Sequence, residues 1–346
     1  MRALVIHAPH DLRVEDFFAE VGDLGPEDVL VRMAAGGICG SDLHYYHHGG
    51  FGTVRVKQPM ALGHEASGHV EAVGSAVKHV AKGDLVAVNP SHPCGTCPSC
   101  QRGAFNHCEN MIFNGSAMRF PHVQGLFREK ISVPQNRVFK IAAPVSAAEA
   151  ALCEPFSVAL HAAKQAGDLK GKRVLVSGCG PIGVLMIVAA RLAGASHIAA
   201  TDITAHSLAV AAKFGCDDCL DVSKGAEVLA PYTENRGQID VVFECSGAPP
   251  AMASALQTLR PQGRIVLVGL GGDAPVPVNM IVAKELEIVG TFRFDLEFAR
   301  AAELISSRTV DLRPMISASF PMAEAVEAFT QASDRTRATK VVINLS

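Results

Sequence analysis

The chain has 346 residues, of which 49% are hydrophobic and 19% are charged, and its formal net charge is −3. This length allows two domains of ordinary size, and the composition is typical of a globular protein. The charge offers no basic surface for nucleic acid or for an anionic membrane, so we predict neither partner. The longest apolar tract, residues 181–200, contains Arg191, Gly194 and His197, which is unlike a membrane span.

The N-terminal stretch MRALVIHAPHDLRVED returns to charged residues after a short apolar run, which predicts a strand and not a signal peptide. Without a secretory signal, we expect the ten cysteines to be thiols or thiolates in a reducing cytoplasm. The runs 28–35, 68–75 and 83–90 are short, β-rich and separated by Gly, Pro and Asp. They predict a barrel-like, all-β domain over residues 1–155.

Four cysteines within this domain have metal-ligand spacing. Cys94, Cys97, Cys100 and Cys108 follow the pattern C-x2-C-x2-C-x7-C. Short gaps let the sulfurs point at one centre, and four thiolates complete a tetrahedral zinc site. A [4Fe–4S] cluster is the alternative, but no second cysteine set accompanies it, so the spacing favours zinc. Such a zinc has no position open to a substrate, and its role is structural.

Three other segments contain donors for a second, open metal site. Cys39 offers a thiolate, His64 an imidazole, and Glu65 and Glu154 offer carboxylates. A mixed set of this kind, with water in the last position, is typical of catalytic zinc. Each residue also has an ordinary structural interpretation, and the segments lie 25 and 90 residues apart. The residues alone leave both interpretations open.

A dinucleotide-binding pattern begins at residue 173. The apolar run 173–177 predicts a strand, and Gly178, Gly180 and Gly183 form G-x-G-x-x-G before a helical pattern. This turn, with Pro181 and Ile182 inside it, is suited to a pyrophosphate at a helix N-terminus. A second strand ends at Asp202, nineteen residues after Gly183, where a carboxylate binds the adenosine ribose. It would repel a 2′-phosphate, so we predict NAD in preference to NADP.

Strands and helices continue to alternate up to residue 295, which predicts an α/β Rossmann domain, a doubly wound parallel sheet, over residues 156–295. Two loops after strand ends are expected to contact the cofactor. They contain Val268, Gly269 and Leu270 in one case and Thr291, Phe292 and Arg293 in the other. The C-x-x-C of Cys216 and Cys219 is interpreted as two packing thiols. Residues 296–346 end in a strand that could complete the first domain.

Taken together, the motifs GGICGSD, GHE, the four-cysteine run and GCGPIG occur in an order that resembles the zinc-dependent medium-chain alcohol and polyol dehydrogenases. The resemblance covers essentially the whole chain. It implies a GroES-like catalytic domain, a Rossmann domain and assembly as homodimers or homotetramers. ICGSDLHYY, CEPFSVALHAA and GTFRF resemble the polyol branch, which includes sorbitol and xylitol dehydrogenases.

The resemblance also implies roles for single residues. Cys39, His64 and Glu154 correspond to ligands of a catalytic zinc, and Glu65 to a glutamate that either binds this zinc or lies just behind it. Ser41 corresponds to the hydroxyl that takes the substrate proton, and His44 to the residue that passes the proton outward. The expected cofactors are NAD and two zinc ions per chain, one catalytic and one structural.

Within this branch, NPSHPCGTC and FNGSAMRFPHVQG are most like dehydrogenases that oxidise a sugar acid. We therefore expect Ser116 and His122 to bind the substrate carboxylate and Arg293 to bind its hydroxyls. Arg119 is also interpreted as a solvated loop charge. The alternatives are a sorbitol, xylitol or threonine dehydrogenase, a non-catalytic zinc and nucleotide sensor of the same fold, and a zinc-ribbon interaction module.

Overall fold

The computed structural model describes residues 1–19 and 21–346. The chain forms two compact units. Unit 1 comprises Met1–Glu154, Phe298–Asp334 and Lys340–Ser346, and unit 2 comprises Pro155–Glu297 and Arg335–Thr339. Most of the C-terminal tail thus packs with the first domain, whereas the short segment 335–339 packs with the second. Among the described residues, no helix has the length and apolar character that crossing a membrane requires.

The main sheet of unit 1 has the order β12-β8-β7-β3-β20-β19, and β11 also pairs with β3. Its strands are β3 (Asp28–Gly37), β7 (Glu65–Val73), β8 (Leu85–Val88), β11 (Lys130–Pro134), β12 (Val138–Lys140), β19 (Ile316–Pro321) and β20 (Lys340–Asn344). The three β-rich runs of the sequence form β3, β7 and β8, as predicted. In β3 every second side chain is buried, starting from Val29, because alternate residues face the core.

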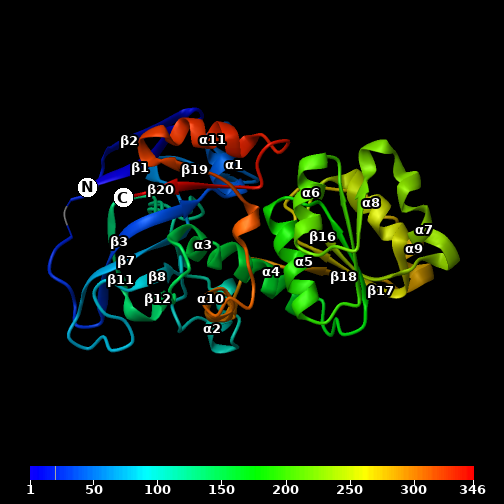
Figure 1. Cartoon of the computed structure of the whole chain (residues 1–346), viewed down its shortest axis with the longest axis horizontal. Coiled ribbons are helices and arrows are strands. Elements are labelled where there is room, and N and C mark those ends of the chain that lie inside the picture. Colours follow the sequence, from blue (N-terminus) through cyan, green and yellow to red (C-terminus); the bar gives the residue numbers. More distant parts are fainter. Residues whose placement is uncertain (20) are drawn as a thin grey trace. The chain divides into compact units, whose positions relative to one another are not determined.

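Smaller elements complete unit 1 (Figure 1). A second sheet has the order β2-β1-β6, and two short pairs, β4-β5 and β9-β10, lie outside it. These strands are β1 (Arg2–Ala8), β2 (Asp11–Asp16), β4 (Gly50–Phe51), β5 (Val54–Arg55), β6 (Met60–Ala61), β9 (Ser91–His92) and β10 (Ile112–Phe113). The helices are α1 (Gly40–His48), α2 (Pro98–Gln101), α3 (Ala147–Ala151), α10 (Glu297–Ser306) and α11 (Ala325–Ser333). Two helices cross the division between the units. Helix α10 begins at Glu297, in unit 2, and continues into unit 1, whereas α4 begins at Cys153, in unit 1, and continues into unit 2.

Unit 2 is a parallel sheet with the strand order β15-β14-β13-β16-β17-β18. The strands are β13 (Arg173–Ser177), β14 (His197–Asp202), β15 (Asp218–Asp221), β16 (Ile239–Glu244), β17 (Leu259–Leu267) and β18 (Glu287–Gly290). The helices are α4 (Cys153–Gln165), α5 (Pro181–Leu192), α6 (Ala205–Lys213), α7 (Ala230–Thr233), α8 (Pro249–Thr258) and α9 (Val278–Lys284). Strand β13, the first of these in the chain, lies in the middle of the sheet, and the strand order reverses beside it. This is the Rossmann arrangement and confirms the predicted fold.

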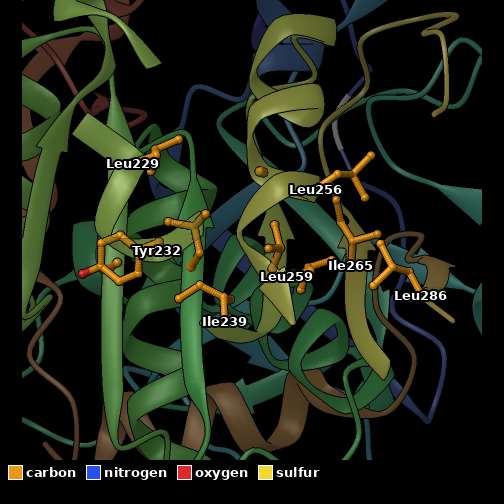
Figure 2. Packing of buried hydrophobic residues seen from close by; sticks show 11 residues of the cluster. Leu229, Tyr232, Ile239, Leu256, Leu259, Ile265 and Leu286 are labelled. Carbon is orange, nitrogen blue, oxygen red and sulfur yellow. The ribbon is translucent and has the colours of Figure 1, made fainter. Parts of the chain in front are cut away.

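One core layer of unit 2 lies between the sheet and its covering helices. Figure 2 shows its side chains, which come from strands, from α7 and the helical turn before it, from α8 and from the loop before β18. Ile239, Ile265 and Leu256 are at most 1% exposed. Burying each such side chain contributes about 1.5–3 kcal/mol. This packing fixes the strand ends at which the cofactor turn is built.

The C-x-x-C segment differs from its sequence interpretation. Cys216 follows α6 and Cys219 lies in β15, and the structure joins them in a disulfide rather than leaving two packing thiols. The turn between helix and strand brings the two sulfurs together, and Cys219 is exposed instead of packed into a core. The eight other cysteines are free.

Candidate metal centres and cofactor site

The first donor of the open site is Cys39, which caps the N-terminus of α1. Strand β3 leads into this helix. The Cys39 residue is partly exposed, but its thiol is enclosed by the protein. The same segment contains Ser41 and His44, the two residues predicted to transfer the proton. Ser41 is half-buried in the first turn of α1, and His44 is exposed one turn later. Their roles in proton transfer remain predictions.

The second segment lies between β6 and β7. His64 is 6% exposed, and its ring packs against Phe113 with a centroid distance of 5.8 Å. Glu65, the first residue of β7, is 1% exposed. One donor atom from each of Cys39, His64 and Glu65 lies within 4.8 Å of the others. The fold thus brings together three donors that the sequence separates by up to 26 positions.

The third segment contributes Glu154 from the first turn of α4, where its side chain is 5% exposed. Within the described part of the chain, the 4.8 Å group does not include its carboxylate. Nevertheless, Glu154 interacts electrostatically with His64, Glu65 and Cys39, so it belongs to the same buried environment.

Lys340 is a residue of this site that the sequence analysis missed. It begins β20, is 2% exposed, and its Nζ donates to the two oxygens of Glu65 at 2.8 and 2.7 Å. The same Nζ donates to the carbonyl of Ile38 at 3.0 Å. A side chain at Gly37 would start 2.3 Å from a Glu65 oxygen, so this glycine leaves room for the carboxylate. The Glu65 carboxylate is therefore held by the ammonium group of Lys340, which is itself held by the Ile38 carbonyl.

Asp42 was missed as well, although its spacing gave a signal. It is fully buried, and its carboxylate accepts hydrogen bonds from the backbone N–H groups of Cys39 at 3.0 Å and Gly63 at 3.3 Å. Its Oδ1 also lies 3.8 Å from Nδ1 of His64. An acidic residue three positions after a helix cap commonly returns to the cap N–H, as Asp42 does here. Asp42 thus ties together the segments that carry two of the donors.

The electrostatics of these residues favour a bound cation. Burial, with the charge of Glu65 adding to it, raises the pKa of Cys39 to about 12. Burial also raises the pKa of Glu154 to about 8, although the charge of His64 acts to lower it. Both donors must lose a proton to bind a metal, and a divalent cation between them would reverse the effect that holds the proton on. Sulfur, nitrogen and oxygen donors in one buried group fit zinc.

The four lobe cysteines form the second donor group. Their sulfurs all lie within 4.8 Å of one another, as the zinc interpretation requires. Backbone N–H groups point at the sulfurs: that of Cys97 donates to Cys94 at 3.4 Å, and that of Cys94 donates to Cys108 at 3.2 Å. Such donors, from Thr96 and Cys97, lower the pKa of Cys94 to about 5. Local turns therefore prepare a thiolate here, and the set fits a structural zinc.

The glycine-rich turn of unit 2 has the geometry that phosphate binding requires. Gly178 has a φ of 91°, and a side chain on Gly183 would start 1.8 Å from the Gly178 carbonyl oxygen. Gly180 caps α5, and Pro181 and Ile182 form the first turn of that helix. The free N–H groups of this helix start are available to a pyrophosphate.

Asp202 ends β14 and reaches back to this turn. Its carboxylate accepts from the backbone N–H of Cys179 at 2.8 Å and from the backbone N–H of Thr204 at 2.8 Å. A cavity of about 300 Å³ opens beside the strand ends, lined by Thr201, Ile203 and largely apolar neighbours. An apolar cavity next to a strand-end carboxylate suits an adenine ring and its ribose.

The other residues predicted to contact the cofactor lie at the same edge of the sheet. The backbone N–H groups of Val268 and Gly269 donate to the Glu244 carbonyl at 2.8 and 2.9 Å, which fixes the loop after β17, while Leu270 is exposed. Thr291, Phe292 and Arg293 follow β18, and the Arg293 guanidinium lies over the Phe292 ring. Arg335 was missed: its Nη1 is 3.3 Å from the position of a Cβ on Gly180. It places a cation beside the phosphate-binding turn.

The predicted substrate residues have specific partners. Ser116 is 7% exposed, and its Oγ accepts from the backbone N–H of Met118 at 3.3 Å. His122 is 6% exposed and uses both ring nitrogens: Nε2 accepts from the Lys57 N–H and Nδ1 donates to the Arg119 carbonyl, each at 2.8 Å. To bind a carboxylate, His122 would have to exchange one of these bonds. Their substrate roles remain predictions.

Comparison with known proteins identifies the family. The model of the alcohol dehydrogenase GroES-like domain matches residues 25–143, and that of the zinc-binding dehydrogenases matches residues 181–307. The chain is 39% identical over 320 residues to L-idonate 5-dehydrogenase (NAD(P)(+)) of Escherichia coli strain K12, which covers 92% of each chain. It is 38% identical to sorbitol dehydrogenase of Homo sapiens over 94% of this chain and 91% of the human one.

A solved structure of L-idonate 5-dehydrogenase from Escherichia coli superposes with a TM-score of 0.94 at 36% identity, covering 99% of this chain and 97% of the other. Both family models, the identities over nearly the full length and the structural match agree with the two donor groups and the glycine-rich turn described above. The chain therefore belongs to the zinc-containing medium-chain dehydrogenases, in the group that includes polyol and sugar-acid enzymes.

Proposed function

We propose that this dehydrogenase oxidises a secondary alcohol of a sugar acid with NAD, most specifically L-idonate to 5-keto-D-gluconate. The observation that carries the proposal is the buried group of Cys39, His64 and Glu65, with Glu154 in the same electrostatic environment. Burial raises the pKa values of the Cys39 thiol and the Glu154 carboxyl group, and a bound cation would lower both. The same chain contains a dinucleotide-binding turn with a ribose carboxylate. A Lewis-acid metal and a hydride acceptor are the two components that such an oxidation needs.

We assign two zinc ions to each chain, a catalytic one to Cys39, His64 and Glu154 and a structural one to the four lobe cysteines. When bound, the catalytic zinc polarises the substrate hydroxyl and lowers its pKa. With Cys39 and Glu154 ionised, this site is neutral, and a further carboxylate in it would weaken the Lewis acid. The contact of Glu65 with Lys340 supports a position for Glu65 behind the ligands, where Lys340 balances its charge.

The chain's own residues move the proton. Ser41 is half-buried next to the zinc ligand Cys39, and His44 is exposed one turn further along α1. A hydroxyl followed by a solvent-facing imidazole is a route by which the substrate proton reaches water. We therefore assign the first transfer to Ser41 and the release to His44.

The cofactor preference rests on Asp202. Asp202 ends β14 between Thr201 and Ile203, which both line the apolar cavity. There its carboxylate would accept a hydrogen bond from a ribose hydroxyl and repel a phosphate. We therefore propose NAD as the preferred cofactor, although the Escherichia coli relative is named for both NAD and NADP. The four thiols of the lobe favour a reducing compartment such as the cytoplasm, whereas the disulfide between Cys216 and Cys219 does not.

The sugar-acid substrate is proposed on the resemblance to the Escherichia coli enzyme, with Ser116, His122 and Arg293 as the contacting residues. The near-equal identity to the human sorbitol enzyme supports a neutral polyol, such as sorbitol or xylitol, as the second candidate. A panel of L-idonate, D-gluconate, sorbitol, xylitol and threonine, each with NAD and NADP, tests the proposal by the absorbance of the reduced cofactor. The highest kcat/KM on L-idonate is expected. A higher value on sorbitol would favour the polyol enzyme, and no turnover of any alcohol would favour the non-catalytic sensor.

We also propose that the chain forms a homodimer or homotetramer through unit 2. Strand β18 ends the sheet order, and Ile288 on it is 42% exposed. Val278 and Val282 on the neighbouring helix α9 are 63% and 71% exposed. An unpaired sheet edge beside exposed apolar side chains suits pairing with a second copy. Light scattering should give a dimer or tetramer mass for the wild type and a lower mass for Ile288→Lys.

A further inference from the structure

A cluster of histidines on the surface of unit 1 is not used as a cluster by the proposed reaction. His44, His47 and His48 come from α1, and His10 comes from the turn between β1 and β2. The ring centroids are 6.0 Å apart for His44 and His48, 6.0 Å for His47 and His48, and 5.2 Å for His10 and His47. Four of the chain's 14 histidines are thus linked ring to ring at one helix end.

Within this cluster, His44 and His48 have the geometry of a chelating pair. They are four residues apart on α1, so their side chains leave the same face of the helix one turn from each other. Both are exposed. Two imidazoles that share one ion at a Zn–N distance of about 2.0–2.1 Å and the tetrahedral angle have ring centres roughly 5.3 Å apart. The observed separation of 6.0 Å exceeds this by less than about 1 Å, which rotation of the two exposed side chains can close.

His47 belongs to a different pair. Its Nε2 is bonded to Ser333 Oγ at 2.7 Å, which leaves only Nδ1 for any other ligand, and its ring meets that of His10 edge to face. His47 and His48 are also adjacent in the helix, so their side chains diverge. The pair with the helical spacing that binds metal in other proteins is therefore His44 and His48.

We propose that His44 and His48 form a third metal site, which binds a divalent transition metal ion such as Zn²⁺ with water completing the coordination. Imidazole selects Zn²⁺, Ni²⁺ and Cu²⁺ over Mg²⁺ and Ca²⁺, which prefer oxygen ligands. The site needs neither of the two donor groups described above.

A consequence for catalysis rests on the proposed function. If His44 releases the substrate proton, a metal ion on its ring removes the nitrogen that does so, and the bound ion inhibits turnover. Free zinc would then slow the enzyme whose catalytic and structural sites are already filled. The metal site itself does not depend on this role, because binding can be measured without substrate.

The test uses holoenzyme containing two zinc ions per chain, equilibrated by dialysis at rising free Zn²⁺ and analysed for bound zinc. A third zinc per chain is expected for the wild type, and His48→Gln should weaken its binding at least tenfold. The matched variants His47→Gln and His69→Gln, the latter on β7, should retain it. A third zinc that survives His48→Gln unchanged, or that is lost in His47→Gln instead, would overturn the assignment.

Activity provides a separate readout in the same samples. Added Zn²⁺ should inhibit the wild type with the same midpoint as the binding curve, and His48→Gln should need at least ten times more. If zinc binds at His48 without inhibition, the metal site stands and the role of His44 in proton release fails. If no third zinc binds to the wild type, the metal site fails and the proposed reaction is untouched.

Discussion

The two donor groups of unit 1 differ in how their ligands are prepared for a metal ion. The lobe cysteines lie within 15 consecutive residues, and backbone N–H groups lower the pKa of Cys94 to about 5. The open site gathers Cys39, His64 and Glu154 from distant segments, and burial raises the pKa of Cys39 to about 12. Hydrogen bonds from local turns thus lower the pKa values of Cys94 and Cys97, while burial raises that of Cys100 in the same lobe to about 12. In the open site, burial raises the pKa values of both Cys39 and Glu154.

This contrast fits the roles proposed for the two sites. In the proposed structural role the closed thiolate set holds a loop, and thiols with a lowered pKa make metal binding part of folding. A catalytic metal must remain a strong Lewis acid. In the proposed site, the charges of the ligands are therefore balanced by the metal ion, and those of neighbouring carboxylates by other residues. Lys340 balances Glu65, and Asp42 fixes the segments of Cys39 and His64. The open site is therefore the one that depends on long-range packing.

The largest expected effect separates the two sites directly. Cys39→Ala removes a ligand of the catalytic zinc, so activity should fall by at least about a thousandfold, because the Lewis acid supplies several kcal/mol of transition-state stabilisation. About one zinc per chain should remain, in the lobe, and the fold should be intact by circular dichroism. Elemental analysis of the variant and the wild type measures the metal.

The matched variant is Cys100→Ala in the lobe. It should also retain about one zinc, but its main loss should be in thermal stability rather than in turnover per folded chain. An active wild type with a single zinc per chain would contradict the assignment of two metals.

The next largest effect tests the contact between Lys340 and Glu65, which joins two distant parts of the chain at the open site. Lys340→Met leaves the Glu65 carboxylate buried without its cation, and breaking a buried pair in this way costs about 3–5 kcal/mol of unfolding free energy. Chemical denaturation of the holoenzyme measures the loss. The double variant Lys340→Met with Glu65→Gln should recover much of it, since no unpaired charge then remains. Equal losses in the single and double variants would show that Lys340 acts through packing alone.

Sequence reasoning predicted the local geometry where the residues of a motif lie in one short segment. The lobe spacing, the glycine-rich turn and the strand ending at Asp202 each lie in one short segment, and their geometry follows from that segment. Lys340 was missed because it lies 275 residues from Glu65 and only the pairing of β20 with β3 brings it there. Asp42 did have a local signal, its position three residues after a helix cap. Cys216 and Cys219 were misinterpreted because their spacing does not show whether the sulfurs face each other.

A smaller effect tests a locally encoded feature of unit 2. Asp202→Asn keeps an acceptor for the N–H groups of Cys179 and Thr204 but removes the charge. The ratio of kcat/KM with NAD to that with NADP should fall about ten- to a hundredfold, because a charge-assisted bond is worth about 1.5–3 kcal/mol. Adding Ile203→Arg, at a 69% exposed position, should move the preference further toward NADP. A wild type that uses NADP as well as NAD would contradict the role of Asp202.

The smallest expected effect concerns the segment that follows the cysteine lobe and contacts helix α1. Residues 114–125 follow the lobe, and the backbone N–H of Ala117 donates to the hydroxyl of Tyr45 on α1 at 3.1 Å. Ser116 accepts from Met118 through its Oγ, which leaves its own proton to donate to a substrate carboxylate.

Ser116→Ala should therefore lower kcat/KM about tenfold on L-idonate, the lower end for a hydrogen bond to a charged group, and change it little on sorbitol. His122→Ala is the comparison, because its ring already holds the backbones of Lys57 and Arg119. A selective loss in both variants would assign the carboxylate to both side chains. An equal loss on the two substrates in Ser116→Ala would show that this segment has only a structural role, and acid specificity would then have to come from another residue, such as Arg293.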